Sequence, residues 1–233
     1  MARGVGDMEQ AAGVIRKGER RTRYYDSTRV LTCTVEYPEF VSKEFPWILN
    51  RINLYYRRKA EGFIHRCSTE LYAQAVEGYR FARQNGYPFI PYEALMVYTI
   101  TLNRFCTISL YFDAYQFTGG AHGGTIRTSD TWNLKEGDRL RLADFFPPGF
   151  PYRAYIFEQI DTQIAEQTAS GENFFFEDAP QLARQTFNED SFYLTDAGLV
   201  IYYQQYDIAP YSSGIIEFLI PYQEGVVSRP GCG

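Results

Sequence analysis

The chain has 233 residues, of which 45% are hydrophobic and 22% are charged. These values are near globular averages, so the composition excludes a disordered, collagen-like or coiled-coil protein and predicts a buried core. The net charge is −5, whereas nucleic-acid-binding proteins carry a basic patch, so we expect no nucleic acid partner. With 20 tyrosines and 18 phenylalanines, the composition also favours a sheet-rich fold with aromatic surfaces.

The first 27 residues are predicted to form a basic, disordered arm. Residues 1–23 hold six lysine or arginine residues against three acidic ones, and glycines interrupt a segment without apolar periodicity. The first 28 residues contain no apolar stretch of the kind found in signal peptides, and no later stretch is long enough to span a bilayer. We therefore expect a cytoplasmic protein without membrane insertion.

Residues 28–124 are predicted to form a first half made of one strand, a long helix and a hairpin. Apolar and polar residues alternate over 29–37, which is typical of a strand. From Ser42, apolar residues recur every 3.6 residues as far as Asn85-Gly86, which predicts one long helix with a bend at Gly62 or at Ser68-Thr69. Strand patterns over 92–102 and 105–117 predict a hairpin that turns at Asn103-Arg104.

One face of this helix carries a row of basic residues that we interpret as solvated. The row consists of Arg51, Arg57, Arg58, Lys59 and Arg66.

Residues 125–222 are predicted to form a second half, followed by a frayed tail over 223–233. A hairpin is predicted from segments 125–134 and 139–142. A helix is predicted over residues 153–167, with Ile156, Ile160 and Ile164 on one face. A short helix near 178–184 is followed by strands at 192–194, 199–203 and 215–221. The order of elements predicts an α+β fold: two β-rich halves of mostly antiparallel strands, with the long helix and a second helix packed on the sheets.

Cysteine and histidine spacing gives no sign of a metal or cofactor. The four cysteines lie far apart without a CxxC motif, so we interpret them as free thiols, with a Cys33–Cys106 disulfide as the alternative. Two histidines cannot form a three-histidine zinc site. We expect neither a metal nor another cofactor.

The first candidate site is a glycine-rich turn that contains His122. Residues 119–124 include four glycines, which permit positive φ and close approach of a ligand to the backbone. Three interpretations stay open: a tight structural crossover, a contact with a ligand or partner, and a catalytic role for His122. The turn lacks the GK[ST] sequence of a phosphate-binding P-loop.

The second candidate site is the tyrosine-rich segment 202–214, which bends at Pro210 and Gly214. Tyrosine and glutamine side chains suit both sugar faces and protein partners, although the segment also fits a core-lining strand with a structured loop. No catalytic residue is predicted. The candidate binding residues are Tyr115, Gly119, Gly120, His122, Gly123, Tyr206, Pro210, Tyr211 and Gly214.

Three segments carry a resemblance to a known family. They are Tyr111–Gly123, with its GGAHG sequence, Trp132–Phe146, and Phe192–Gly214, with its YDIAPYSSG sequence. Over residues 28–222 the chain resembles the paired domains of RsiV-type lysozyme-sensing anti-sigma factors and of the non-catalytic N-terminal region of PdaC-type peptidoglycan deacetylases. The resemblance implies an α+β module used outside the cytoplasm, which binds a muramidase in the sensors. The deacetylase activity does not carry over, because its Asp and two-His metal set cannot be built from His65 and His122.

The sequence therefore favours a non-enzymatic binding module whose partner is an unidentified protein or glycan. The resemblance makes a muramidase-type protein one such partner. Two alternatives stay open: a glycan-processing or hydrolytic enzyme with His122 as general base, and a structural protein that dimerises through its long helix.

Overall fold

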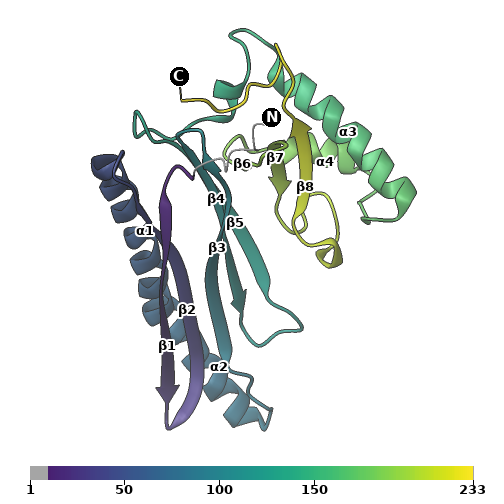
Figure 1. Ribbon diagram of the computed structural model, residues 1–233. Coiled ribbons are helices and arrows are strands. Elements are labelled where there is room, and N and C mark those ends of the chain that lie inside the picture. Colours follow the sequence, from purple (N-terminus) through teal and green to yellow (C-terminus); the bar gives the residue numbers. More distant parts are fainter. Residues whose placement is uncertain (1–9, 233) are drawn as a thin grey trace, which may run out of the picture.

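The computed structural model describes residues 10–232 and contains two sheets with helices on their outer faces (Figure 1). The first sheet has the order β1-β2-β3-β4-β5, and its β2–β3 pair is parallel while its other pairs are antiparallel. Its strands are β1 (Gly13–Tyr25), β2 (Thr28–Val41), β3 (Tyr92–Arg104), β4 (Thr107–Phe117) and β5 (Gly124–Asn133). The predicted α+β class is confirmed.

The prediction of a disordered arm is wrong for residues 13–25, which form edge strand β1. This strand pairs with β2 along its whole length, and Arg16 and Lys17 form ion pairs with Glu36 and Glu39 of β2. The side-chain amide of Asn103 hydrogen-bonds both the N–H and the carbonyl of Ala12, which fixes the start of β1. The many charges in this segment suit an edge strand, because charged side chains discourage pairing with another chain. Residues 1–9 of the predicted arm lie outside the described residues.

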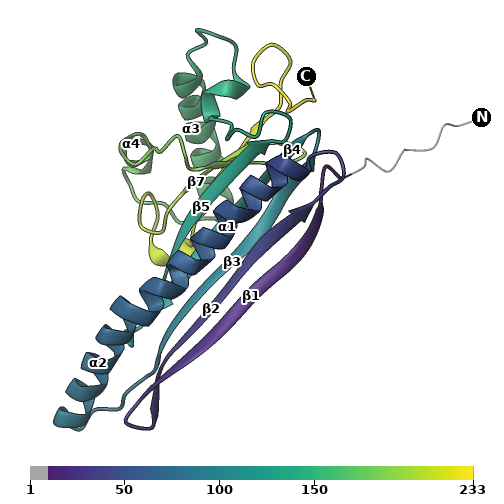
Figure 2. The ribbon, with the colours of Figure 1, turned by 90° about the vertical axis from the view of Figure 1, so that its left-hand side faces the viewer.

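The predicted long helix is three consecutive segments: α1 (Pro46–Arg66), the π-helical turn η1 (Cys67–Leu71) and α2 (Tyr72–Asn85). It begins at Pro46, since proline fits the first helical turn, while the Ser42 hydroxyl accepts a hydrogen bond from the N–H of Glu44. The bend predicted at Ser68-Thr69 falls in the π turn. Figure 2 shows the helices lying along one face of the first sheet, where their apolar residues join the main core.

The hairpin between β3 and β4 turns at Phe105-Cys106, two residues later than predicted. Both residues have positive φ, 55° and 53°, as in the tight turns that match the twist of antiparallel strands. Cys106 is held there by a disulfide to Cys232.

This disulfide corrects two further predictions. Cys106 and Cys232 are not free thiols, and the alternative Cys33–Cys106 pair does not form; Cys33 and Cys67 are the buried free cysteines. The C-terminal segment is also not frayed over its described part. In addition to the disulfide, Gln223 pairs with Val227, and the Ser228 N–H donates to the Phe145 carbonyl at 2.8 Å.

The second sheet is a three-stranded antiparallel sheet of β6 (Phe192–Leu194), β7 (Gly198–Tyr203) and β8 (Ile216–Pro221). Helices α3 (Tyr152–Ser170) and α4 (Ala179–Gln185) contribute to its own core, which contains Ile156, Ile160 and Ile164 as predicted. The predicted strand at 139–142 is a single bridge, Trp132–Arg139, followed by a 3-10 turn over Leu142–Phe145. The Asp144 carboxylate accepts the Arg141 N–H at 2.8 Å, which favours this turn over a strand.

The two sheets pack against each other through alternate residues. In β7, Leu199, Ile201 and Tyr203 belong to the helix-covered core, whereas Val200 and Tyr202 face Tyr111 of β4. Strand β5, the first element of the predicted second half, pairs with β4, so the first sheet contains residues from both halves. Among residues 10–232, no helix is long and apolar enough to cross a membrane.

Removing the Cys106–Cys232 disulfide is predicted to destabilise the fold. The bond closes a sequence separation of 126 residues, so replacing both cysteines by serine should lower the free energy of unfolding by about 2–5 kcal/mol. Urea unfolding with and without reductant measures this loss. Reductant should weaken the wild type and leave the double variant unchanged; equal stability of the two proteins without reductant would contradict the prediction.

Candidate functional site

Within residues 10–232, no strand of either sheet pairs with the outer edge of β5, and two glutamine side chains occupy part of it. Gln204 and Gln205 follow β7 directly. The Gln204 Oε1 accepts the Arg127 N–H at 2.9 Å, and its Nε2 donates to the Arg127 carbonyl at 2.8 Å. The Gln205 Oε1 accepts the Thr125 N–H at 2.8 Å. The Gln204 amide thus pairs with Arg127 as a peptide group of a neighbouring strand would, and fixes the following loop against β5.

The side chain of Arg127 joins the two sheets. Its guanidinium donates two hydrogen bonds to Asp113 of β4, at 2.7 and 2.8 Å, and another to Glu217 of β8. It also lies 3.7 Å from the centre of the Tyr111 ring. Burial alone would lower the pKa of Arg127, but the hydrogen bonds and the charge of Asp113 outweigh it and raise that pKa. Arg127 is therefore a charged contact between the sheets.

The structure brings the two candidate segments together through stacked rings. We call residues 119–124 the glycine turn and residues 206–214 the tyrosine loop. The His122 ring stacks on Tyr211, with centroids 3.8 Å apart and planes 20° apart, and Tyr206 lies 6.0 Å from Tyr211. His122 Nδ1 lies 3.1 Å from the Gly123 carbonyl. Because a carbonyl only accepts, this hydrogen bond places a proton on Nδ1.

Glycine is needed at specific positions in both segments. A side chain at Gly123 would overlap the Tyr115 ring, which packs on this backbone. Gly119 has φ +84°, and Gly214 combines φ 69° with ψ −144°, a conformation essentially restricted to glycine. Pro210 precedes the short 3-10 turn Tyr211–Ser213 that presents Tyr211.

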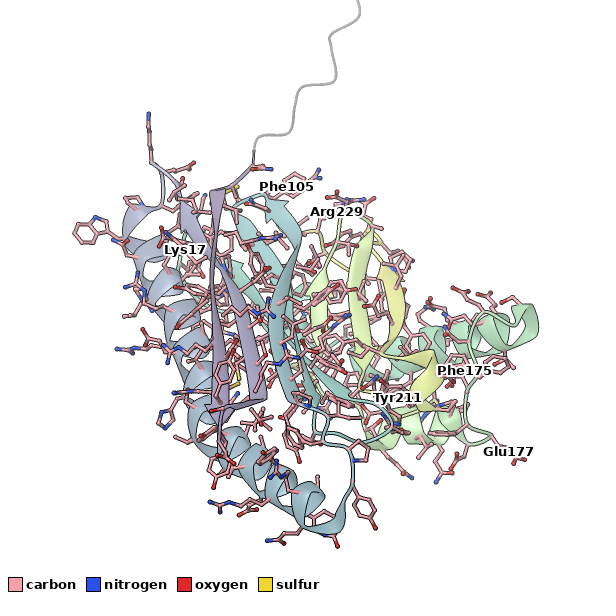
Figure 3. All side chains as sticks on the ribbon, turned by 90° about the horizontal axis from the view of Figure 1, so that it is seen from below. Lys17, Phe105, Phe175, Glu177, Tyr211 and Arg229 are labelled. Atoms are coloured by element: carbon pink, nitrogen blue, oxygen red, sulfur yellow. A yellow bond between two sulfur atoms is a disulfide. The ribbon has the colours of Figure 1, made fainter. Side chains whose placement is uncertain are left out.

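The tyrosine loop is held from its other side by the segment before α4. The Ser213 hydroxyl donates to the Phe174 carbonyl at 3.0 Å, and the Phe176 N–H donates to the Ile208 carbonyl at 3.1 Å. Figure 3 shows Tyr211 at the end of the molecule that also carries Phe175 and Glu177. The loop is therefore tied both to β5 and to the segment before α4.

A groove of about 590 Å³ runs beside the glycine turn. Of the predicted site residues, Tyr115, His122 and Tyr206 line it. Its opposite wall is the turn of the long helix around η1, where Arg66, Glu70 and Gln74 face the groove. This wall was missed in the sequence, because charged residues on a helix have the same pattern whether they face bulk water or a groove.

The surroundings of His122 also bear on a catalytic role. A general base needs a proton-bearing partner within hydrogen-bond reach. Among residues 10–232, the polar contact of the His122 ring is with a backbone carbonyl rather than a side chain. No cluster of three or more metal-ligating side chains occurs in the same range.

Comparison with known proteins divides the chain into two matched regions. Residues 25–125 match the family described as deacetylase PdaC, and residues 143–223 match the family described as protein of unknown function (DUF3298). No curated protein matches the chain in sequence.

Two crystal structures of DUF3298 family proteins share the fold. One, from Bacteroides fragilis, has a TM-score of 0.70 and 17% identity, with 95% of each chain covered. The other, from Pseudomonas aeruginosa, has a TM-score of 0.59 and 19% identity, with 94% of this chain and 95% of the other covered. At these identities the likeness establishes the fold alone.

Shortening Gln204 is predicted to loosen the tyrosine loop. In Gln204→Ala, the N–H and carbonyl of Arg127 lose their partners, so the free energy of unfolding should fall by about 1–3 kcal/mol. The free energy of unfolding of Gln204→Glu should lie between those of the wild type and Gln204→Ala. A carboxylate can accept from the Arg127 N–H but cannot donate to the Arg127 carbonyl. Urea unfolding of the three proteins gives the order, and wild-type stability in Gln204→Ala would refute the proposed edge contact.

Proposed function

We propose that this chain, which matches the PdaC family model over residues 25–125 and the DUF3298 family model over residues 143–223, is a non-enzymatic binding module for a glycan chain. The glycan lies in the groove and packs against the rings of the glycine turn and the tyrosine loop. The observation that carries the proposal is the His122–Tyr211 stack at 3.8 Å, which joins the two predicted segments beside that groove.

The chemistry of the groove suits a sugar chain. The apolar face of a sugar ring packs on aromatic side chains, while its hydroxyl and acetamido groups need both donors and acceptors. Tyr206 is 56% exposed beside the stacked pair and is available for such packing. Gln74, Glu70 and Arg66 on the opposite wall supply amide, carboxylate and guanidinium groups.

The groove is also formed in advance. Hydrogen bonds from Gln204, Gln205 and Ser213 hold the tyrosine loop, so binding needs little ordering of the loop. A preformed site retains more of its contact energy as affinity.

The resemblance to lysozyme-sensing proteins and peptidoglycan deacetylases supports a particular kind of glycan. Both are associated with polymers of N-acetylated amino sugars. We therefore use β-1,4-linked N-acetylglucosamine oligomers as the probe. A muramidase-type protein is the competing partner that the same resemblance implies.

Calorimetric titration with the N-acetylglucosamine hexamer should give saturable binding. His122→Ala should weaken it by about tenfold or more, since His122 lines the groove and central aromatic contacts dominate binding energy. Tyr211→Ala should also weaken it, because Tyr211 stacks on the His122 ring and holds it in place. Trp47→Ala is the matched control, because Trp47 is an 83% exposed aromatic on α1 that does not line the groove. An absence of heat, or an equal loss in all three variants, would rule out this binding site.

The same titration with a C-type lysozyme tests the competing partner. It is performed at moderate salt, because an acidic chain attracts a basic protein non-specifically at low salt. Binding of lysozyme that requires Tyr211, with no binding of the hexamer, would replace the glycan by a muramidase.

A further inference from the structure

We propose that the groove continues along β5 into a second subsite for a neutral sugar residue, formed around Lys59, Asp130 and Arg139. This inference rests on the proposed glycan-binding function and extends it to the length of glycan that the protein recognises.

The second subsite is a cavity of about 420 Å³ at the same edge of β5. It shares Ile126 and Gln204 with the groove, so the two spaces adjoin at these residues. Ile126 is 65% exposed at the junction and offers an apolar surface to a ring that passes from one space to the other.

A buried carboxylate lies at the wall of this cavity. The Asp130 side chain is 1% exposed. Its Oδ1 lies 2.8 Å from Arg139 Nη2 and accepts a hydrogen bond from the Tyr55 hydroxyl at 3.3 Å. Its Oδ2 has no hydrogen-bond partner among residues 10–232, and Lys59 Nζ lies 3.7 Å away, beyond hydrogen-bond reach. Lys59 and Arg139 form ion pairs with this carboxylate, but a buried acceptor atom without a hydrogen bond is still costly unless a donor reaches it.

A sugar hydroxyl fits this pair because it donates and accepts at once. It can donate to Asp130 Oδ2 while accepting from Lys59 Nζ, with small movements of the Lys59 side chain. Lys59 already donates to the Thr128 hydroxyl at 2.8 Å, which leaves its other N–H groups for a ligand. Burial lowers the pKa of Lys59, although the Asp130 carboxylate opposes this shift.

The balance of charge favours a neutral ligand over an anion. Lys59 and Arg139 are offset by Asp130 and by Asp190, which also lines the cavity. Arg127, the other charged lining residue, is paired with Asp113 and Glu217. The remaining lining of the cavity is rich in hydroxyl and amide groups, including Ser191 and Asn188 from the second half. Because such groups both donate and accept, they suit a ring with several hydroxyls.

The length dependence of glycan affinity tests the second subsite. Calorimetric titration compares the N-acetylglucosamine trimer, which fills the groove alone, with the hexamer, which also reaches the subsite. The wild type should bind the hexamer about tenfold more tightly than the trimer, as expected for one further well-placed contact of about 1.4 kcal/mol. Lys59→Gln and Arg139→Gln should each remove this gain and leave trimer affinity unchanged.

Arg58→Gln is the matched control, because Arg58 is an exposed neighbour of Lys59 on α1 that does not line the cavity. Arg139 is 45% exposed, so Arg139→Gln keeps the test valid if Lys59→Gln fails to fold. Equal affinity of the wild type for trimer and hexamer would overturn the second subsite, whose cavity would then hold only water. The proposed function would not be affected by this result. Failure of both oligomers to bind would overturn both proposals.

Discussion

The pairing of the Gln204 side chain with the edge of β5 is the contact on which the candidate site depends. A sheet edge exposes backbone groups that need partners, and here a side-chain amide supplies both a donor and an acceptor to Arg127. This fixes the point where the chain leaves β7. The tyrosine loop begins two residues later, so its position against the glycine turn follows from this contact.

Neither half of the chain holds the site by itself. The glycine turn joins β4 to β5 in the first sheet, whereas the tyrosine loop joins β7 to β8 in the second. Arg127 connects the sheets by pairing with Asp113 on one side and Glu217 on the other. Because a buried charge is stable only with its partners in place, a shift of one sheet against the other is costly. The His122–Tyr211 stack lies at the junction that this arrangement keeps rigid.

Local periodicity was enough to predict much of the fold. Three sequence patterns each indicated a single structure. They are the spacing of the isoleucines in α3, the alternation in β2 and β4, and the short apolar runs that form the second sheet. Strand β1 could not be predicted this way, since its charged residues lack apolar alternation and it is held by pairing with β2. The Cys106–Cys232 disulfide was also missed, because a contact between residues 126 positions apart has no local pattern.

The candidate site, like the fold, could be predicted only in part from the sequence. The glycines and tyrosines at its centre are unusual enough in sequence to be found, and the structure places them together. Lys59 and Arg66 were interpreted as part of a solvated helix face, yet one lies 3.7 Å from a buried carboxylate and the other lines the groove. Their role depends on the strand edge that lies opposite them. The periodicity of the helix sequence contains no information about that edge.

The central claim is that the glycine turn and the tyrosine loop act as one binding surface. Mapping backbone amide shifts by nuclear magnetic resonance during titration with the N-acetylglucosamine hexamer tests it most directly. The account predicts that amides of residues 119–124 and 206–214 shift together with a single apparent affinity. Shifts confined to one of the two segments, or located on the far face of the long helix, would contradict it.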